Sequence, residues 1–395
     1  MTRPIPYRVG VYLALLQLIF TLCWTVYAIY LPRLAAQVGI SPGAVIFILM
    51  LDQAIFTIFD VATGVAADKV SRVIGRLGAI VAAVTIVSCA AFVALPFVSP
   101  AGPIALPLFL ALTIVWAMTS SALRAPPLML LGKYAARPSI PLLSSLAMLG
   151  YGLAGAAAPY LAITLREQNP RLPFVLASVA LVLTTFGLSH VERTLARRPA
   201  EPLSIKAPDK TTSIEVRPMI FAAAMVVLAL GYQLHFTINT APLFRRFTDN
   251  VDHLIPIFWV GFNIAMFPAT LLVKRYGGLS VMGLFGVLGA LSILAAELAG
   301  ALGLLVIAQL AAGASWGCIL MSAFTAAFAA GKDGAQGKMV GILFSALALA
   351  TFARMAATAA GLQRDWLPLL QWAPIICWAI AGAALLYLAV GRIRR

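Results

Sequence analysis

The sequence predicts an all-α membrane protein whose twelve transmembrane helices form two six-helix bundles, with both termini in the cytoplasm. Composition, hydropathy and one long polar segment lead to this prediction. Of the 395 residues, 62% are hydrophobic and 10% are charged, and the mean hydropathy is +0.99. About a quarter of the residues in a soluble domain are charged. The few charged side chains of this sequence cannot form a water-facing surface around a core, so the chain is expected to be surrounded by lipid.

The basic residues and the cysteines do not change this class. The net charge is +15, but Lys and Arg are spread over short segments between apolar runs, which does not predict nucleic-acid binding. The four cysteines lie inside apolar runs at unrelated spacings: Cys23, Cys89, Cys318 and Cys377. Such cysteines are typical of packing residues rather than disulfides or metal ligands, so no metal or cofactor is expected.

Twelve apolar runs are long enough to cross a bilayer, which takes about 20 residues in a helix. The first run has the length of a transmembrane helix rather than that of a signal peptide. The predicted spans are 8–31, 45–66, 77–99, 104–131, 140–165, 172–191, 217–240, 253–273, 278–299, 302–330, 338–362 and 367–390.

The distribution of Lys and Arg predicts the orientation. With the N-terminus inside, cytoplasmic segments hold 20 of the 28 basic residues and external segments hold six. The remaining two, Arg124 and Arg354, fall within spans. Because Lys and Arg are enriched in cytoplasmic loops, both termini are expected in the cytoplasm.

The longest polar segment, Val191 to Pro218, divides the spans into six and six and contains four prolines. It predicts an N-terminal bundle over 1–192, a cytoplasmic linker over 193–216 and a C-terminal bundle over 217–395. A weak internal repeat agrees with two related halves, because the segment at 130–155 is similar to the segment at 329–361.

The segment Gly64-Val-Ala-Ala-Asp68-Lys-Val-Ser-Arg72 resembles the G-x-x-x-D-R/K-x-x-R loop between spans two and three of the major facilitator superfamily. The resemblance implies a monomeric transporter, not an enzyme, in which two bundles rock about a central site. A narrower similarity to the glycoside–pentoside–hexuronide cation symporters rests on Asp60, Gly64 and Asp68 and on Arg124-Ala-Pro-Pro127. Arg124 replaces an acid of the cation-coupled members, which favours protons over sodium.

Four charged residues lie within spans two, four and eleven: Asp52, Asp60, Arg124 and Arg354. A charge at this depth costs several kcal/mol and therefore needs a partner or a function. Helix depth predicts a pair between Asp60 and Arg124 inside the N-terminal bundle. Depth, together with the contact of spans two and eleven that the resemblance implies, predicts a second pair between Asp52 and Arg354. Three alternatives remain: both are permanent salt bridges, at least one opens with protonation or substrate and couples transport to protons, or the pairing by depth is wrong.

The loop residues Gly64, Asp68 and Arg72 form a candidate gate. We expect Asp68 to lie near the positively polarised N-terminus of span eleven, which begins near Lys338, and to hold the two halves together at the cytoplasmic edge. The alternative is an ordinary solvated loop.

Spans one, four, seven and ten line the central cavity in the resembled fold. Their polar and aromatic residues at helical spacing are the substrate-binding candidates: Gln17, Thr21, Trp24, Trp116, Ser120, Tyr232, His235, Asn239 and Trp316. Aromatic rings with a few hydrogen-bonding groups suit a small organic molecule, although the same stripes also occur in plain packing. The guanidinium of Arg124, with its paired N–H donors, favours an anionic or zwitterionic solute over a neutral sugar.

The sequence therefore predicts a proton-coupled symporter for a small polar or anionic organic solute in a bacterial inner membrane. Three alternatives remain: proton-driven drug or metabolite export, passive facilitation, and, in another class, a membrane-embedded transferase. The glycines and Pro159 of the segment 149–161 faintly resemble a motif of drug exporters. The transferase is disfavoured because no acid or histidine cluster converges at the membrane surface.

Overall fold

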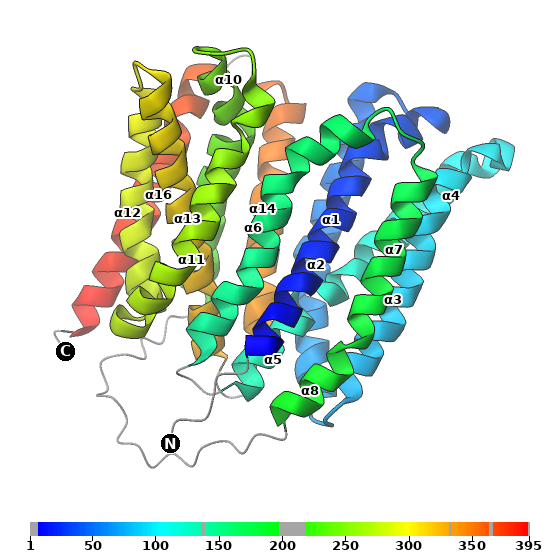
Figure 1. The fold of residues 1–395 in the computed structure, drawn as a ribbon, viewed down its shortest axis with the longest axis horizontal. Coiled ribbons are helices and arrows are strands. Elements are labelled where there is room, and N and C mark those ends of the chain that lie inside the picture. The colour runs from blue at the N-terminus through cyan, green and yellow to red at the C-terminus, as the bar shows by residue number, and fades with distance from the viewer. Residues whose placement is uncertain (1–6, 136–138, 197–217, 332–333, 363–365, 394–395) are drawn as a thin grey trace.

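The computed structural model describes residues 7–135, 139–196, 218–331, 334–362 and 366–393 (Figure 1). Every regular element in these ranges is a helix, and twelve helical segments are long and apolar enough to cross a membrane. The predicted all-α fold class with twelve spans is confirmed. The helices are α1 (Tyr7–Gln37), α2 (Val45–Val70), α3 (Arg76–Ala94), α4 (Ala105–Ser120), α5 (Ala125–Tyr134), α6 (Ile140–Leu165), α7 (Arg171–Phe186), α8 (Leu188–Ala196), α9 (Pro218–Gln233), α10 (Thr240–Arg245), α11 (Pro256–Tyr276), α12 (Gly278–Glu297), α13 (Leu302–Ala330), α14 (Gln336–Ala359) and α16 (Leu367–Ile393).

The helices fall into two halves, α1–α8 and α9–α16, which stand side by side in Figure 1. The two halves meet mainly where α2 packs on α14 and where α6 packs on α11. The first described helix, α1, begins and the last, α16, ends at the lower side of Figure 1, which we call the terminal face; the opposite side is the open face. Helix α8 extends to Ala196, into the predicted linker 193–216, and residues 197–217 lie outside the described part.

Small residues bring the backbones of α2 and α14 into direct contact. A Cβ atom on Gly64 would meet the carbonyl of Gly337, and one on Gly341 would meet the carbonyl of Asp60. The Ser345 hydroxyl also donates to the backbone carbonyl of Thr57. Glycine is required here because, without a hydrophobic driving force in lipid, helices associate through such close backbone packing.

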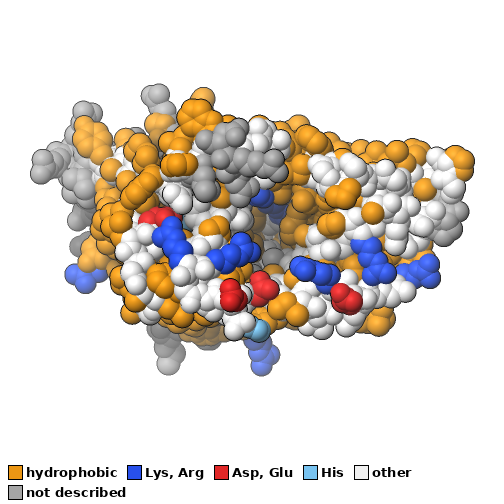
Figure 2. Space-filling view, turned by 90° about the horizontal axis from the view of Figure 1, so that it is seen from above, with side chains coloured by type: hydrophobic (Ala, Val, Ile, Leu, Met, Phe, Trp, Pro, Cys, Tyr) orange, Lys and Arg blue, Asp and Glu red, His pale blue; other side chains and the backbone are white. Residues whose placement is uncertain are grey.

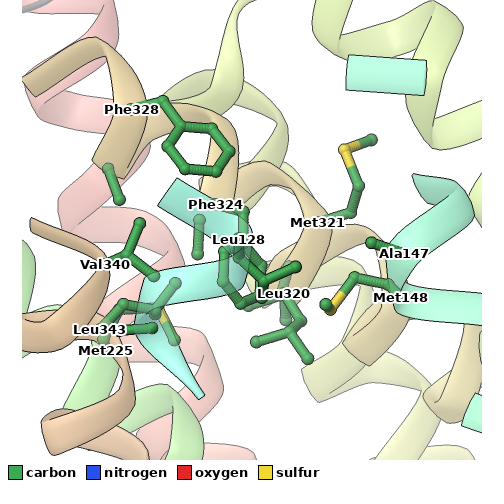
Figure 3. Packing of buried hydrophobic residues seen from close by; sticks show 14 of the residues in the cluster. Leu128, Ala147, Met148, Met225, Leu320, Met321, Phe324, Phe328, Val340 and Leu343 are labelled. Atoms are coloured by element: carbon green, nitrogen blue, oxygen red, sulfur yellow. The ribbon is translucent and has the colours of Figure 1, made fainter. Parts of the chain in front are cut away.

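Apolar side chains from both halves pack against one another (Figure 3). Leu320 and Phe324 also line the cavity described below, and Phe328 and Val340 lie nearer the end of α13 and the start of α14, on the side of the terminal face. We call this group the apolar seal: Leu128, Leu320, Phe324, Phe328, Val340 and Leu343, each no more than 4% exposed. They come from α5, α13 and α14, so the two halves are interlocked at this level. Gly132 of α5 leaves room for the Phe328 ring, where a Cβ would collide.

Two consecutive prolines break the fourth span into α4 and α5. Pro126 and Pro127 cannot donate backbone hydrogen bonds, and the chain tightens into a 3₁₀ turn over Ser121–Leu123. Arg124 lies at the junction, with φ −88° and ψ −74°. The break therefore decides where the Arg124 side chain points.

Candidate functional site

A cavity of about 210 Å³ lies between the two halves, beyond the apolar seal. Figure 2, seen from the open face, shows a hollow between the same two halves, with a basic side chain set back inside it. Six residues that the sequence predicts for the site line the cavity: Gln17, Thr21, Trp24, Arg124, Tyr232 and Trp316. The cavity is thus closed toward the terminal face by the seal and bordered by polar groups from both halves.

Stacked aromatic rings form a wall in each half. Trp24 of α1 stacks on Trp116 of α4 with ring centroids 5.3 Å apart and planes 9° apart. Tyr232 of α9 stacks on Trp316 of α13 at 4.4 Å and 3°. The Trp316 indole nitrogen is buried and has no hydrogen-bond partner among the described residues. Such flat walls suit the apolar body of a small organic molecule.

Asp60 and Arg124 form an ion pair at the sealed end of the cavity. The Arg124 Nη1 lies 3.0 Å from Asp60 Oδ2; the Arg124 side chain is 14% exposed, whereas that of Asp60 is completely buried. Arg124 lines the cavity and also lies over the rings of Phe56 and Phe344, at 4.6 and 5.0 Å from their centroids. Neither Asp60 oxygen meets hydrogen-bond geometry with a described residue, although Ser121 lies close enough to interact. The pair is therefore held by charge, with the arginine between the acid and the cavity.

The expected pair between Asp52 and Arg354 is not formed. Asp52 is completely buried inside the N-terminal half, where its Oδ2 accepts a hydrogen bond from the Tyr27 hydroxyl at 2.9 Å. Arg354 makes no ion pair or side-chain hydrogen bond with a described residue, and its Nε is buried without a partner.

Helix register explains this correction. Along the α2–α14 contact, Asp60 lies against Gly341 and Thr57 against Ser345. Continuing that register places Asp52 opposite residues 349–350, so Arg354 lies about 6–7 Å nearer the open face. Asp52 is also turned by about 100° from the cavity-lining Gln53, because successive residues differ by one such step around a helix. The prediction of the Asp52–Arg354 pair used only the depth of each residue along its helix and did not include this rotation about the helix axis.

The contact between Asp52 and Tyr27 yields a stability prediction. Tyr27→Phe removes the only hydrogen bond that the buried Asp52 carboxylate accepts within the described residues and should destabilise the protein by about 1–3 kcal/mol. The matched control is Tyr30→Phe, because the Tyr30 hydroxyl is buried without a partner among the described residues. Denaturation of the purified variants measures both. Equal stability of the two variants would contradict a structural role for the Tyr27 hydroxyl.

Asp68 lies at the N-terminus of α14, on the terminal face. The backbone N–H groups of Gly337 and Lys338 donate to its two carboxylate oxygens over 2.7 and 2.8 Å. Beside it, the Lys133 ammonium donates to the Ser71 carbonyl at 2.6 Å. Arg72 is exposed on the same face. The loop therefore connects the two halves at the sealed end.

Four other candidates lie away from the cavity surface. Trp116 and Ser120 are buried behind it, the former under Trp24. His235 and Asn239 occupy a π-helical segment, Leu234–Asn239, that turns them into the C-terminal half. There His235 Nε2 contacts Gln309 Oε1 at 3.1 Å, and the Asn239 amide donates to the Leu370 carbonyl at 3.1 Å. The i, i+3, i+7 spacing predicted a shared face with Tyr232, and the π-helical turn shifts that register.

The sequence analysis did not identify six further cavity residues. Five lie outside the four expected spans, namely Gln53 and Phe56 of α2, Tyr151 of α6, and Phe344 and Thr351 of α14, and the sixth, Gln233 of α9, lies inside span seven. Gln53 and Gln233 carried a usable signal, since each is a polar side chain inside an apolar run. The Gln233 amide donates to the Thr351 hydroxyl at 3.0 Å across the wall. No group of three or more His, Cys, Asp or Glu within the described ranges could hold a metal ion.

Known structures share this fold at low sequence identity. A bacterial homologue of the iron transporter ferroportin, in an outward-facing state, matches with a TM-score of 0.72 and 13% identity, covering 98% of this chain and 100% of that one. The same homologue with soaked iron gives 0.73 and 14%, covering 96% and 98%. The E. coli fucose:proton symporter gives 0.61 and 15%, covering 99% of each chain. No curated protein matches the sequence.

The family follows from a match along most of the chain. The family model described as Major Facilitator Superfamily matches residues 13–355. This range contains the loop motif at Gly64–Arg72, both charged groups of the Asp60–Arg124 pair and every residue named above as lining the cavity. The twelve-span protein is an integral membrane protein and belongs to the Major Facilitator Superfamily.

Proposed function

We propose that this protein is a proton-coupled secondary transporter that moves a small polar or anionic organic solute by alternating access. The observation that carries the proposal is the Asp60–Arg124 pair, because it places a buried acid directly behind a cation that forms part of the cavity wall. The similarity to the fucose:proton symporter supports the transporter fold, and the titratable Asp60–Arg124 pair supports the coupling of transport to protons.

The pair offers a simple coupling device. While Asp60 is ionised, Arg124 is neutralised and presents no net charge to the cavity. A proton on Asp60 removes that attraction and leaves Arg124 as a cation facing the solute, still supported by the rings of Phe56 and Phe344. Proton and solute thus favour each other's binding, which is the energetic coupling that symport needs.

The direction of opening follows from the seal and the charge distribution. We propose that the terminal face is cytoplasmic, because most Lys and Arg belong to segments that reach it. The hollow of Figure 2 then faces outward, and the apolar seal with the Asp68 contact closes the cytoplasmic side. Solute would enter from outside and leave when the halves rock.

Proteoliposomes that contain a trapped pH indicator test this function. Gluconate, glucuronate, glutamate and glucose are added outside, since none crosses lipid unaided. The expected result is internal acidification by at least one of them, only when the protein is present. Uptake of a labelled solute with no pH change would overturn proton coupling and leave a passive facilitator.

A further inference from the structure

Arg354 is a cation in the outer half of the membrane region whose counter-ion is missing from the described chain. Its Nε is buried without a hydrogen-bond partner, and its guanidinium forms no ion pair with a described residue. The acids that the structure describes within the spans already have other partners: Asp60 contacts Arg124, Asp52 contacts Tyr27, Asp68 contacts the N-terminus of α14, Glu192 contacts the Gly78 amide and Glu297 contacts Arg246. Because an unpaired charge at this depth is costly, a counter-ion from outside the described residues is expected there.

The position of Arg354 points to the cavity. On α14, Phe344, Leu347, Ala348 and Thr351 line the cavity. Arg354 follows Thr351 by three residues, so it shares that face and lies about 4.5 Å nearer the open face.

The charges around the cavity select the sign of the ligand. Asp60 and Arg124 cancel while both are ionised, so Arg354, one helical turn beyond the lining residue Thr351, gives the open end of the cavity a net positive charge. A cationic solute would be repelled, and a neutral one would leave Arg354 uncompensated. An anion entering from the open face meets this positive potential first and is attracted by it.

We propose that Arg354 is the docking residue for a carboxylate and that the transported solute is an organic acid. The carboxylate pairs with the Arg354 fork near Thr351 and Gln233, and the body of the solute lies against the Trp24 and Tyr232 walls. This inference rests on the proposed transport function and names its substrate class.

Thermal denaturation with matched pairs of ligands is the first test. The probes are lactate and lactamide, phenylacetate and phenylacetamide, nicotinate and nicotinamide, glucuronate and glucuronamide. At least one acid is expected to raise the Tm while its amide does not, since ligand binding to the folded state stabilises it. Arg354→Gln should lower the affinity for that acid by about tenfold or more. Arg246→Gln is the control, because Arg246 pairs with Glu297 away from the cavity. Stabilisation by no acid, equal stabilisation by acid and amide, or an unchanged response of Arg354→Gln would overturn the proposal.

A second measurement does not depend on the choice of solute. Thr351→Cys, in a chain whose native cysteines are replaced by serine, is labelled with a negatively and a positively charged methanethiosulfonate reagent. Arg354 should favour the negative reagent about tenfold relative to free cysteine, and Arg354→Gln should abolish the preference. Arg354→Lys should keep the preference for the negative reagent but lower the affinity for the organic acid, because an ammonium group lacks the planar donor geometry of a guanidinium. No preference in the parent would overturn the proposal even if Arg354→Gln fails to fold.

The two proposals fail separately. An organic acid that binds through Arg354 and crosses without a pH change would overturn proton coupling alone. A neutral solute that enters with protons and is indifferent to Arg354→Gln would overturn the docking role alone.

Discussion

Asp60→Asn is expected to abolish proton-driven accumulation while leaving solute exchange intact. A pH difference of one unit supplies about 1.4 kcal/mol per proton, enough for about tenfold accumulation by the parent protein. The amide cannot take up the coupling proton, so the variant should reach a ratio of about one. Exchange of labelled for unlabelled solute needs no net proton movement, and Arg124 in this variant stays available as a cation beside Phe56 and Phe344. Proteoliposomes with an imposed pH gradient measure both activities.

Two controls make this result specific. Glu167→Gln removes an exposed acid and should accumulate solute like the parent. Asp60→Asn leaves Arg124 without its buried counter-charge, which is itself destabilising. The double variant Asp60→Asn with Arg124→Gln restores neutrality and separates folding from coupling. Accumulation that survives in a folded Asp60→Asn protein would make the pair a static salt bridge.

The sequence was sufficient for the fold because lipid imposes a strong pattern. A helix must satisfy its own backbone and needs about 20 apolar residues, so each span is visible as a run. The same depth counting placed Asp60 near Arg124, and the two side chains are in contact. It also placed Asp68 beside the start of α14, where its carboxylate accepts two backbone hydrogen bonds.

Depth counting is insufficient where rotation or a local irregularity decides. Asp52 lies about 6–7 Å from the level of Arg354 along the contact of α2 with α14 and faces Tyr27 in its own half. His235 and Asn239 follow Tyr232 at regular helical spacing, and the π-helical segment turns them inward. The contribution of Gln53 and Thr351 to the cavity depends on how α2 and α14 are packed together, and that arrangement is tertiary information. The spacing of polar and apolar residues along one helix does not reveal how two helices pack.

Asp68→Asn is expected to open the terminal face. The carboxylate of Asp68 accepts two charge-assisted hydrogen bonds from the N-terminus of α14, where a negative charge is also favoured by the helix dipole. The neutral amide loses the charge and can accept through only one oxygen. A loss of about 1–2 kcal/mol from the closed state should increase the population open at this face by about 5–30-fold.

Thiol labelling of a cysteine placed within the apolar seal measures this opening directly. Leu128→Cys lies within the seal, with Leu128 1% exposed, and should react with a water-soluble thiol reagent only when the two halves separate there. In a background without the native cysteines, Asp68→Asn should raise the labelling rate by the same factor. Lys69→Gln is the matched control, because Lys69 is the adjacent exposed charge.

Gly341→Val supplies an independent way to open the same interface. Its added side chain would collide with the Asp60 carbonyl and push α2 and α14 apart, so labelling of Leu128→Cys should rise without any change of charge. If Gly341→Val increases labelling and Asp68→Asn does not, close packing of the helices alone holds the terminal face closed. If both increase it, the Asp68 contact contributes its own share. In that case a one-atom change of side-chain chemistry shifts the balance between the two states of the transporter.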